Sequence, residues 1–239
     1  MTHFDWSQIT RYGLIEALMP LGSQIVDQKI TVRRVQGILR GCLKSLMPIY
    51  VISSRESKHG RNWIAVGGEY WSEYDRWYRR CIKLVLVYHP EDNHIHINRY
   101  RWRRICRNIA DTVMHEIIHL RQYRARKFKT IPGFQSTAYL ARQRREQEYL
   151  GHPDEIGAYA FNIACELHDQ FGGNIRRAQA YLNQDRGGRK KRSSLGAYLR
   201  NFDHDHQHPV IRRLKRKISH YLPYAASGRP FRTLDHLHR

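Results

Sequence analysis

Three residues of this chain are well spaced to do chemistry: His115, His119, and Glu116, which directly follows the first histidine. On an α-helix a spacing of four residues places two side chains on one face, so both imidazoles can bind one metal ion. Glu116 points about 100° further round the helix axis, where its carboxylate can reach a water molecule on that ion. Zinc lowers the pKa of such a water to about 7, and a neighbouring carboxylate can accept its proton. The pattern favours a zinc site that hydrolyses an amide bond, with Glu116 as the general base.

The segment around these residues has the pattern of a long, partly buried helix. Residues 103–122 contain no proline or glycine, and Pro132 and Gly133 follow. We therefore expect the helix to end near Lys127. Its apolar residues form two adjacent rows at i,i+4 spacing, which together make a wide face suited to burial: Ile105, Ile109, Val113 and Ile117, then Cys106, Ala110, Met114 and Ile118. The histidines thus lie in mid-helix beside a core-facing surface. The alternative is a chance pair of histidines with Glu116 in solvent.

A third metal ligand must come from elsewhere, and Glu155 is the best candidate. Gly151 and Pro153 end the preceding helix, and Pro153 with Asp154 suits the start of a new one. Glu155 would then lie in a first turn that is followed by small residues. Such a turn can pack closely against the helix of His115 and direct a carboxylate to the metal.

With these residues the chain resembles the gluzincin zinc metallopeptidases, in which two histidines of a His-Glu-x-x-His helix and a glutamate from a later helix bind zinc. The run Glu155-Ile-Gly-Ala158 is similar to the Glu-x-x-Ala signature around that glutamate. The resemblance covers about residues 80–170 and does not extend to a particular family. It implies that His115, His119 and Glu155 bind zinc and that Glu116 is the catalytic base. It also implies an edge strand immediately before the helix, with which the substrate backbone pairs.

The sequence departs from the gluzincin pattern in two places. The thermolysin group has an aspartate four residues after its glutamate ligand, and Tyr159 stands at that position here. Asp111 or Asp154 can serve instead as the hydrogen-bond acceptor that a ligating imidazole requires. The spacing from His119 to the candidate glutamate is also longer than in thermolysin. His152 is therefore a rival third ligand, and a three-histidine site would resemble the SprT-like proteases.

The rest of the first half predicts an α+β fold. Residues 31–47 have helical spacing, and four segments read as strands: 49–53, 63–66, 82–89 and 94–98. We expect a zincin-like arrangement in which an N-terminal helix and a small mixed sheet pack on the helix of His115, followed by a helical C-terminal part. His94 and His96 share one strand face, which is compatible with a metal site, but we expect a polar outer face of an edge strand instead. The aromatic run 69–80 is expected to be a hairpin packed on the core, with a nucleic-acid-stacking surface as the alternative.

Composition limits where the protein acts. The chain has 239 residues, of which 41% are apolar, enough for one domain with a substantial core and an appendage. We find neither an apolar run long enough to span a membrane nor a signal peptide. The four cysteines are far apart and read as buried free thiols of a reducing compartment: Cys42, Cys81, Cys106 and Cys165. The expected location is the cytoplasm, or a virion assembled there if the chain is phage-encoded.

The charge points to a polyanionic partner. Forty-two Lys and Arg residues against 21 Asp and Glu give a formal net charge of +21. Solubility does not require such a charge, and no helix-turn-helix, zinc-finger or RNA-recognition signature accompanies it. We therefore expect contacts to nucleic-acid phosphates that depend on salt and have little sequence selectivity. A basic but merely solvated surface is the alternative.

The C-terminal part has the character of an extension. We place a zincin-like domain at residues 1–183 and a basic, helical extension at residues 184–239, which begins with a flexible linker at 185–194. Helices are expected at 175–182 and 209–221. The histidine cluster of residues 204–208 is more consistent with a loop that binds metal adventitiously, so it is not counted as a site.

Three functions are compatible with these features. The first is a zinc endopeptidase in which Glu116 deprotonates the attacking water and then protonates the leaving amine. The second is a peptidase that acts on nucleic-acid-bound or virion proteins. The third is a catalytically inactive, zincin-like basic protein with a structural or nucleic-acid-binding role in a phage particle.

Overall fold

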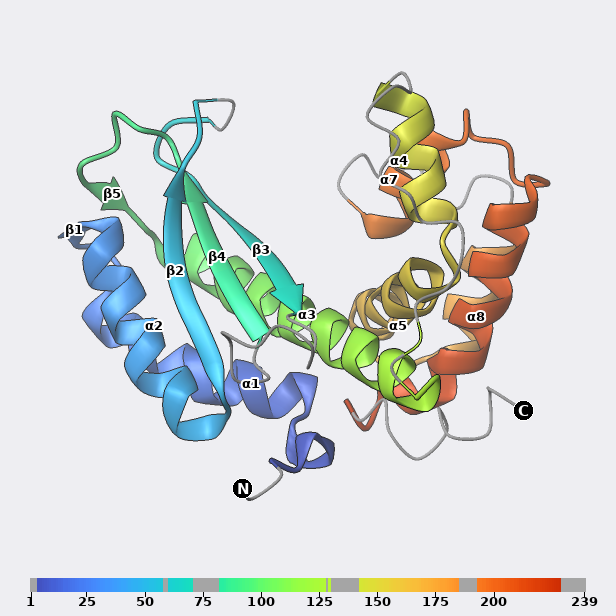
Figure 1. Ribbon diagram of the computed structural model, residues 1–239, viewed down its shortest axis with the longest axis horizontal. Coiled ribbons are helices and arrows are strands. Elements are labelled where there is room, and N and C mark those ends of the chain that lie inside the picture. The colour runs from blue at the N-terminus through green and yellow to red at the C-terminus, as the bar shows by residue number, and fades with distance from the viewer. Residues whose placement is uncertain are drawn as a thin grey trace. The chain divides into compact units, whose positions relative to one another are not determined.

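The computed structural model describes residues 4–57, 60–70, 82–127, 129, 142–184 and 193–228. It has an α+β fold, as expected, and divides into two compact units, Met1–Leu120 and Arg121–Arg239. Figure 1 shows both units, with most of their helices and strands labelled. The predicted domain boundary between residues 183 and 184 stays a prediction. Within the described residues no helix has the length and apolar character needed to cross a membrane.

Among its described residues the first unit contains three α-helical segments and two small sheets. The helices are α1 (Arg11–Leu18), α2 (Val32–Leu46) and the first part of α3 (Arg99–Ala125). A three-stranded mixed sheet has the order β2-β4-β3, where β2 (Ile49–Arg55) is parallel and β3 (Ile64–Tyr70) antiparallel to β4 (Ile82–Tyr88). Short strands β1 (Lys29–Ile30) and β5 (Ile95–His96) pair antiparallel.

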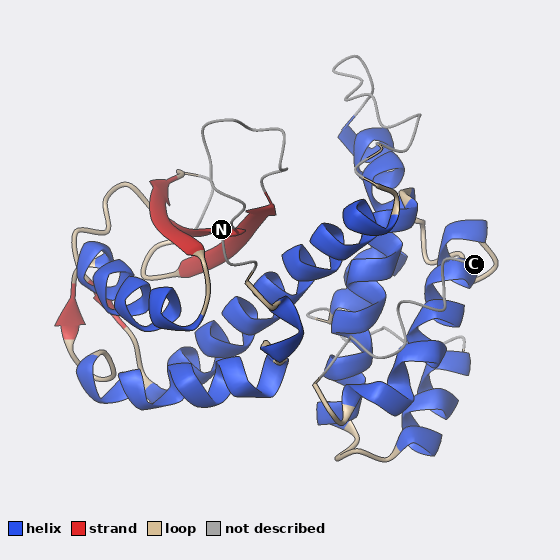
Figure 2. Cartoon of the chain, turned by 60° about the horizontal axis from the view of Figure 1, so that its bottom comes forward, coloured by secondary structure: helices blue, strands red, loops and turns tan. Residues whose placement is uncertain are grey.

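One face of the mixed sheet carries the core of this unit. The register aligns Val51, Leu84 and Gly68 across the three strands, so these residues share a face. Helix α2 packs on that face, where Ser53 Oγ donates to Gln36 Oε1 at 2.9 Å. Gly68 lies against α3 on the same face. Figure 2 shows the helices of this unit on one side of the mixed sheet. The other face is partly exposed: Tyr50 is 50% exposed, whereas Val87 on the same face is buried.

The predicted helices and strands of this unit are confirmed, with two changes at the start of α3. This helix begins at Arg99 because the Asn98 side chain accepts a hydrogen bond from the Arg101 backbone N–H at 2.8 Å and caps the first turn. That cap shortens the preceding strand, β5, to two residues. His94 and His96 are exposed while Ile95 is buried, as expected for an outer strand face. The aromatic run 69–80 lies, beyond Tyr70, outside the described residues.

The second unit is helical. It contains the last turn of α3 and α4 (Arg142–Gly151), α5 (Pro153–Gln170), α6 (Ile175–Asn183), α7 (Ser194–Asn201) and α8 (Pro209–Ala225). Helix α5 forms its centre: the residues from Ile156 to Cys165, apart from Tyr159, are buried, and α8 packs along it. The small residues Gly157, Ala158, Ala160 and Ala164 let neighbouring helices approach closely.

Helix α7 overturns part of the predicted linker at 185–194. Ser193 caps the helix by accepting a hydrogen bond from the Gly196 backbone N–H at 3.0 Å. The Glu166 carboxylate on α5 accepts bonds from the backbone N–H and the hydroxyl of Ser194. Two serines that suggested flexibility therefore begin a helix: Ser193 caps it, and the Glu166 carboxylate binds Ser194. Residues 185–192 lie outside the described residues.

The described cysteines are free, as predicted. Cys106 and Cys165 are fully buried and Cys42 is half-buried, whereas Cys81 lies outside the described residues. Burial raises the pKa of the Cys106 thiol to about 12 and raises that of Cys42 as well. These thiols are therefore poor nucleophiles at neutral pH.

Candidate metal centre

Helix α3 brings the two histidines together. Their Nε2 atoms lie 2.9 Å apart, and the rings meet edge-on with centroids 4.5 Å apart. His115 is buried and His119 is half-buried, so the pair opens toward solvent on one side. The i,i+4 spacing therefore produces converging nitrogen atoms, as two ligands of one ion require.

Glu155 joins this pair from the first turn of α5. His152 caps that helix by accepting a hydrogen bond from the Asp154 backbone N–H at 3.3 Å, and Pro153 occupies its first position. Ligand atoms of His115, His119 and Glu155 all lie within 4.8 Å of one another. Across the described part of the chain, this is the one group of three or more such side chains close enough to hold an ion.

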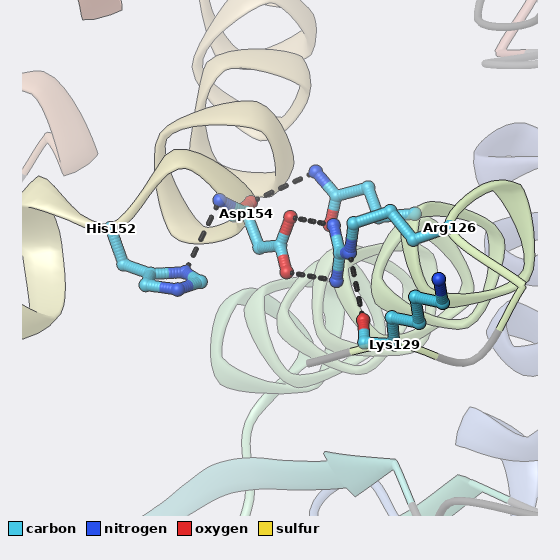
Figure 3. Close-up of polar contacts among 5 residues, drawn as sticks. Arg126, Lys129, His152 and Asp154 are labelled. Carbon is cyan, nitrogen blue, oxygen red and sulfur yellow. Dashed lines mark hydrogen bonds and ion pairs between the residues drawn. The ribbon is translucent and has the colours of Figure 1, made fainter. Parts of the chain in front are cut away.

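The first turn of α5 is attached to the last turn of α3 by side chains of the second unit (Figure 3). Arg126 forms two parallel bonds to the Asp154 carboxylate, at 2.6 and 2.7 Å. Gln122, which is buried, donates from Nε2 to the Asp154 backbone carbonyl at 3.1 Å. We call these contacts the Asp154 clamp. Because Glu155 is the next residue, the clamp positions its backbone relative to α3.

A glycine makes the clamp possible. A Cβ atom at Gly157 would lie 2.5 Å from Nε2 of Gln122, closer than real Cβ contacts allow. Any larger residue at this position would push Gln122 away from the Asp154 carbonyl. The Glu155-Ile-Gly-Ala158 run thus contains both a candidate ligand and the small residue that lets α5 approach the end of α3.

Glu116 is buried beside the mixed sheet of the first unit. It is 7% exposed, and a Cβ atom at Gly68 of β3 would lie 2.9 Å from its Oε1 and 2.5 Å from Thr112 Cγ2. The backbone of β3 therefore runs directly against the Glu116 side chain. Within the described residues β3 pairs with β4 alone and lies at the edge of its sheet.

The residues present fit zinc. Two zinc-bound nitrogen atoms at tetrahedral geometry are roughly 3.3 Å apart, given Zn–N bonds near 2.05 Å. The observed Nε2 separation of 2.9 Å is close to that value, so a small rotation of either ring accommodates the ion. Two imidazoles and one carboxylate form the ligand set of an open zinc site. The partial exposure of His119 and Glu155 gives solvent access to it.

Other residues considered from the sequence have contacts of their own, and the expected hydrogen bond from a ligating imidazole to Asp111 or Asp154 stays a prediction. Asp111 accepts a bond of 2.6 Å from Nε of the buried Arg11, and Asp154 belongs to the clamp. Tyr159 packs edge-on against Tyr198, whose hydroxyl donates to the Leu150 carbonyl at 3.2 Å. Burial raises the pKa of Tyr198 far above its usual value, and Tyr159 and Glu155 add to this shift, so Tyr198 stays neutral.

The histidine cluster of residues 204–208 belongs to the loop before α8. His208 caps α8 by accepting from the Val210 backbone N–H at 3.2 Å and packs on Phe202. His206 Nδ1 lies 3.0 Å from Lys215 Nζ. These contacts hold the loop against α8 and agree with leaving the cluster off the site.

Two features of the site were missed from the sequence. The first is Gly68, although two adjacent glycines inside a strand often mark a close approach to another element. The second is the Asp154 clamp, which pairs residues more than 25 positions apart and leaves no local pattern. No protein-family model, curated protein or solved structure matches this chain. Its function must therefore be inferred from the site.

Proposed function

We propose that the protein is a zinc-dependent metallopeptidase. The observation that supports this proposal is the convergence of His115, His119 and Glu155 within 4.8 Å, with a buried Glu116 adjacent to the first histidine. A structural zinc site is normally closed by four protein ligands, whereas this group offers three. In hydrolysis, a carboxylate buried next to such a site accepts the proton of the attacking water. A purely structural site does not require this proton acceptor.

In this mechanism His115, His119 and Glu155 hold the ion. When bound, zinc supplies Lewis acidity that polarises the scissile carbonyl and lowers the pKa of a coordinated water. Glu116 accepts a proton from the attacking water as its oxygen bonds to the carbonyl carbon. Glu116 then delivers this proton to the amide nitrogen as the C–N bond breaks. The Asp154 clamp keeps Glu155 in position, and β3 limits the movement of the Glu116 side chain.

The proposal is tested by measuring metal content and peptide cleavage on the same preparations. Protein purified without a histidine tag is analysed for zinc and assayed on casein, as wild type, Glu155→Ala and Glu116→Gln. We expect about one zinc ion per chain in the wild type and in Glu116→Gln, and much less in Glu155→Ala. Cleavage should be at least about 100-fold lower in Glu116→Gln, because the variant lacks a proton acceptor.

Glu146 provides the matched control because it is an exposed helical glutamate on α4. Glu146→Gln and Glu146→Ala should retain both zinc and cleavage. A wild type that takes up no zinc after supplementation would overturn the proposal. A zinc-loaded wild type that cleaves neither casein nor a peptide library would leave the zincin-like structural protein as the better account.

A further inference from the structure

We propose that the outer face of α8 is a docking surface for the phosphate backbone of a nucleic acid. Four cationic side chains form this surface, which we call the α8 cationic face: Arg212, Arg213, Arg216 and Lys217. The three arginines are exposed and the lysine is half-buried. The proposal does not depend on the metal centre.

All four cations lie on the side of α8 that faces solvent. The opposite side is fully used in the core of the second unit, where α8 packs along α5. It presents only buried residues: Ile211, Leu214, Ile218, Tyr221, Leu222 and Ala225. The helix contains no acidic residue in any of its turns. Its outer face therefore carries positive charge without any negative charge, beside the exposed Pro223 and Tyr224 of the last turns, and the core anchors the helix.

The described part of the protein does not neutralise these cations. No ion pair or side-chain hydrogen bond within the described residues involves Arg212, Arg213, Arg216 or Lys217. By contrast, Arg11 and Arg126 each bind an aspartate. The α8 cationic face thus remains available to an external anion.

The arrangement costs folding stability. Arg212 faces Arg216, and Arg213 faces Lys217, across single turns of helix, and like charges at this spacing repel. Arg212 and Arg213 also lie near the helix N-terminus, where the helix dipole disfavours cations. Each effect is small, but all have the same sign. An external polyanion turns this repulsion into attraction.

The chemistry favours nucleic acid over an anionic membrane. Helices that bind membranes insert a free apolar face between lipids, and α8 has none because its apolar side is buried. Arginines one turn apart are spaced by about 6 Å along the helix. This is close to the spacing of successive phosphates, so one row can contact neighbouring phosphates of a backbone. Contacts of this type carry no base specificity.

The test measures binding of the full-length protein to a fluorescent DNA duplex of about 20 base pairs, by anisotropy at several salt concentrations. The test variant replaces all four residues of the α8 cationic face by alanine. A control variant removes the same charge from dispersed exposed cations: Lys29, Arg34, Lys44 and Arg145. We expect the test variant to bind about 100-fold more weakly at 100 mM salt, and its log–log salt slope to fall by roughly 3 to 4.

The control variant should lose less than about tenfold in affinity, since its charges act only through the long-range field. Circular dichroism checks that both variants are folded. A second variant with three Arg→Lys replacements keeps the charge and should bind within about threefold of the wild type. Equal losses of duplex affinity in the test and control variants would overturn the proposal. Tight binding of the wild type to phosphatidylserine vesicles, together with no binding to the duplex, would also overturn it.

Discussion

The metal centre and the α8 cationic face use polar residues in opposite ways. At the metal centre buried groups are fixed by short contacts, such as the Nε2–Nε2 approach of 2.9 Å and the Asp154 clamp. On α8 the cations extend into solvent without partners among the described residues. A fixed, buried group should lose metal binding when one member is removed, and salt screens the interactions within such a group only little. An exposed face should lose affinity gradually and respond strongly to salt.

The largest effect should follow from removing a histidine ligand. His119→Ala should weaken zinc binding by at least about 100-fold, since it removes one of three ligands. Competition with a chromogenic chelator measures this affinity, and the loss should be the same at 50 and 500 mM salt. The exposed His94→Ala is the control and should bind zinc like the wild type. A loss that shrinks at high salt would contradict the contrast between the two regions.

The second effect tests how closely β3 approaches Glu116. Gly68→Ala places a methyl group within contact distance of Thr112 and Glu116, and this overpacking should reduce the free energy of unfolding by about 1–3 kcal/mol. The displaced carboxylate should also lower the rate of cleavage while zinc is retained. Urea unfolding and the casein assay measure the two consequences.

Gly67 provides a control on the same strand. A Cβ atom there meets nothing within 4 Å, so Gly67→Ala should be neutral or slightly stabilising. If Gly68→Ala and Gly67→Ala have the same free energy of unfolding and the same rate of cleavage, the strand does not confine Glu116 in solution.

The third effect concerns the Asp154 clamp. Asp154→Asn removes the charge that Arg126 binds through two bonds, so the first turn of α5 should become more mobile. We expect zinc affinity to fall about tenfold, as is usual when a group that positions a ligand is lost. The exposed Asp27→Asn should leave zinc affinity unchanged. Unchanged zinc affinity in Asp154→Asn would mean that Glu155 needs no clamp.

These predictions also show where sequence reasoning succeeded. The helix of His115 and the first turn containing Glu155 were predicted because apolar periodicity and the Gly151–Pro153 break act over a few residues. Gly68, Gln122 and Arg126 could not be assigned in this way. Their roles arise from contacts between segments distant in sequence, which no local spacing encodes.

Helix α7 shows the same limit. Ser193 and Ser194 follow a run of glycine and basic residues, and such a composition is typical of a flexible linker. The bonds from Ser194 to Glu166 on α5 depend on tertiary packing, and they convert the end of that run into a helix. The composition of the run was outweighed here by the Ser193 cap and the Glu166 carboxylate together.

The smallest effect would sharpen the description of the α8 cationic face. Burial lowers the pKa of Lys217, so this lysine loses its proton at a lower pH than the value near 10.4 of an exposed lysine. The neighbouring arginines remain charged throughout this range. Duplex binding should therefore begin to weaken, through the loss of this charge, at a lower pH than it would with an exposed lysine. Lys217→Arg should remove this change and bind up to about threefold more tightly than the wild type at pH 9.5. If both proteins weaken equally, Lys217 makes no contact with the phosphate backbone, and the docking surface is reduced to the three arginines.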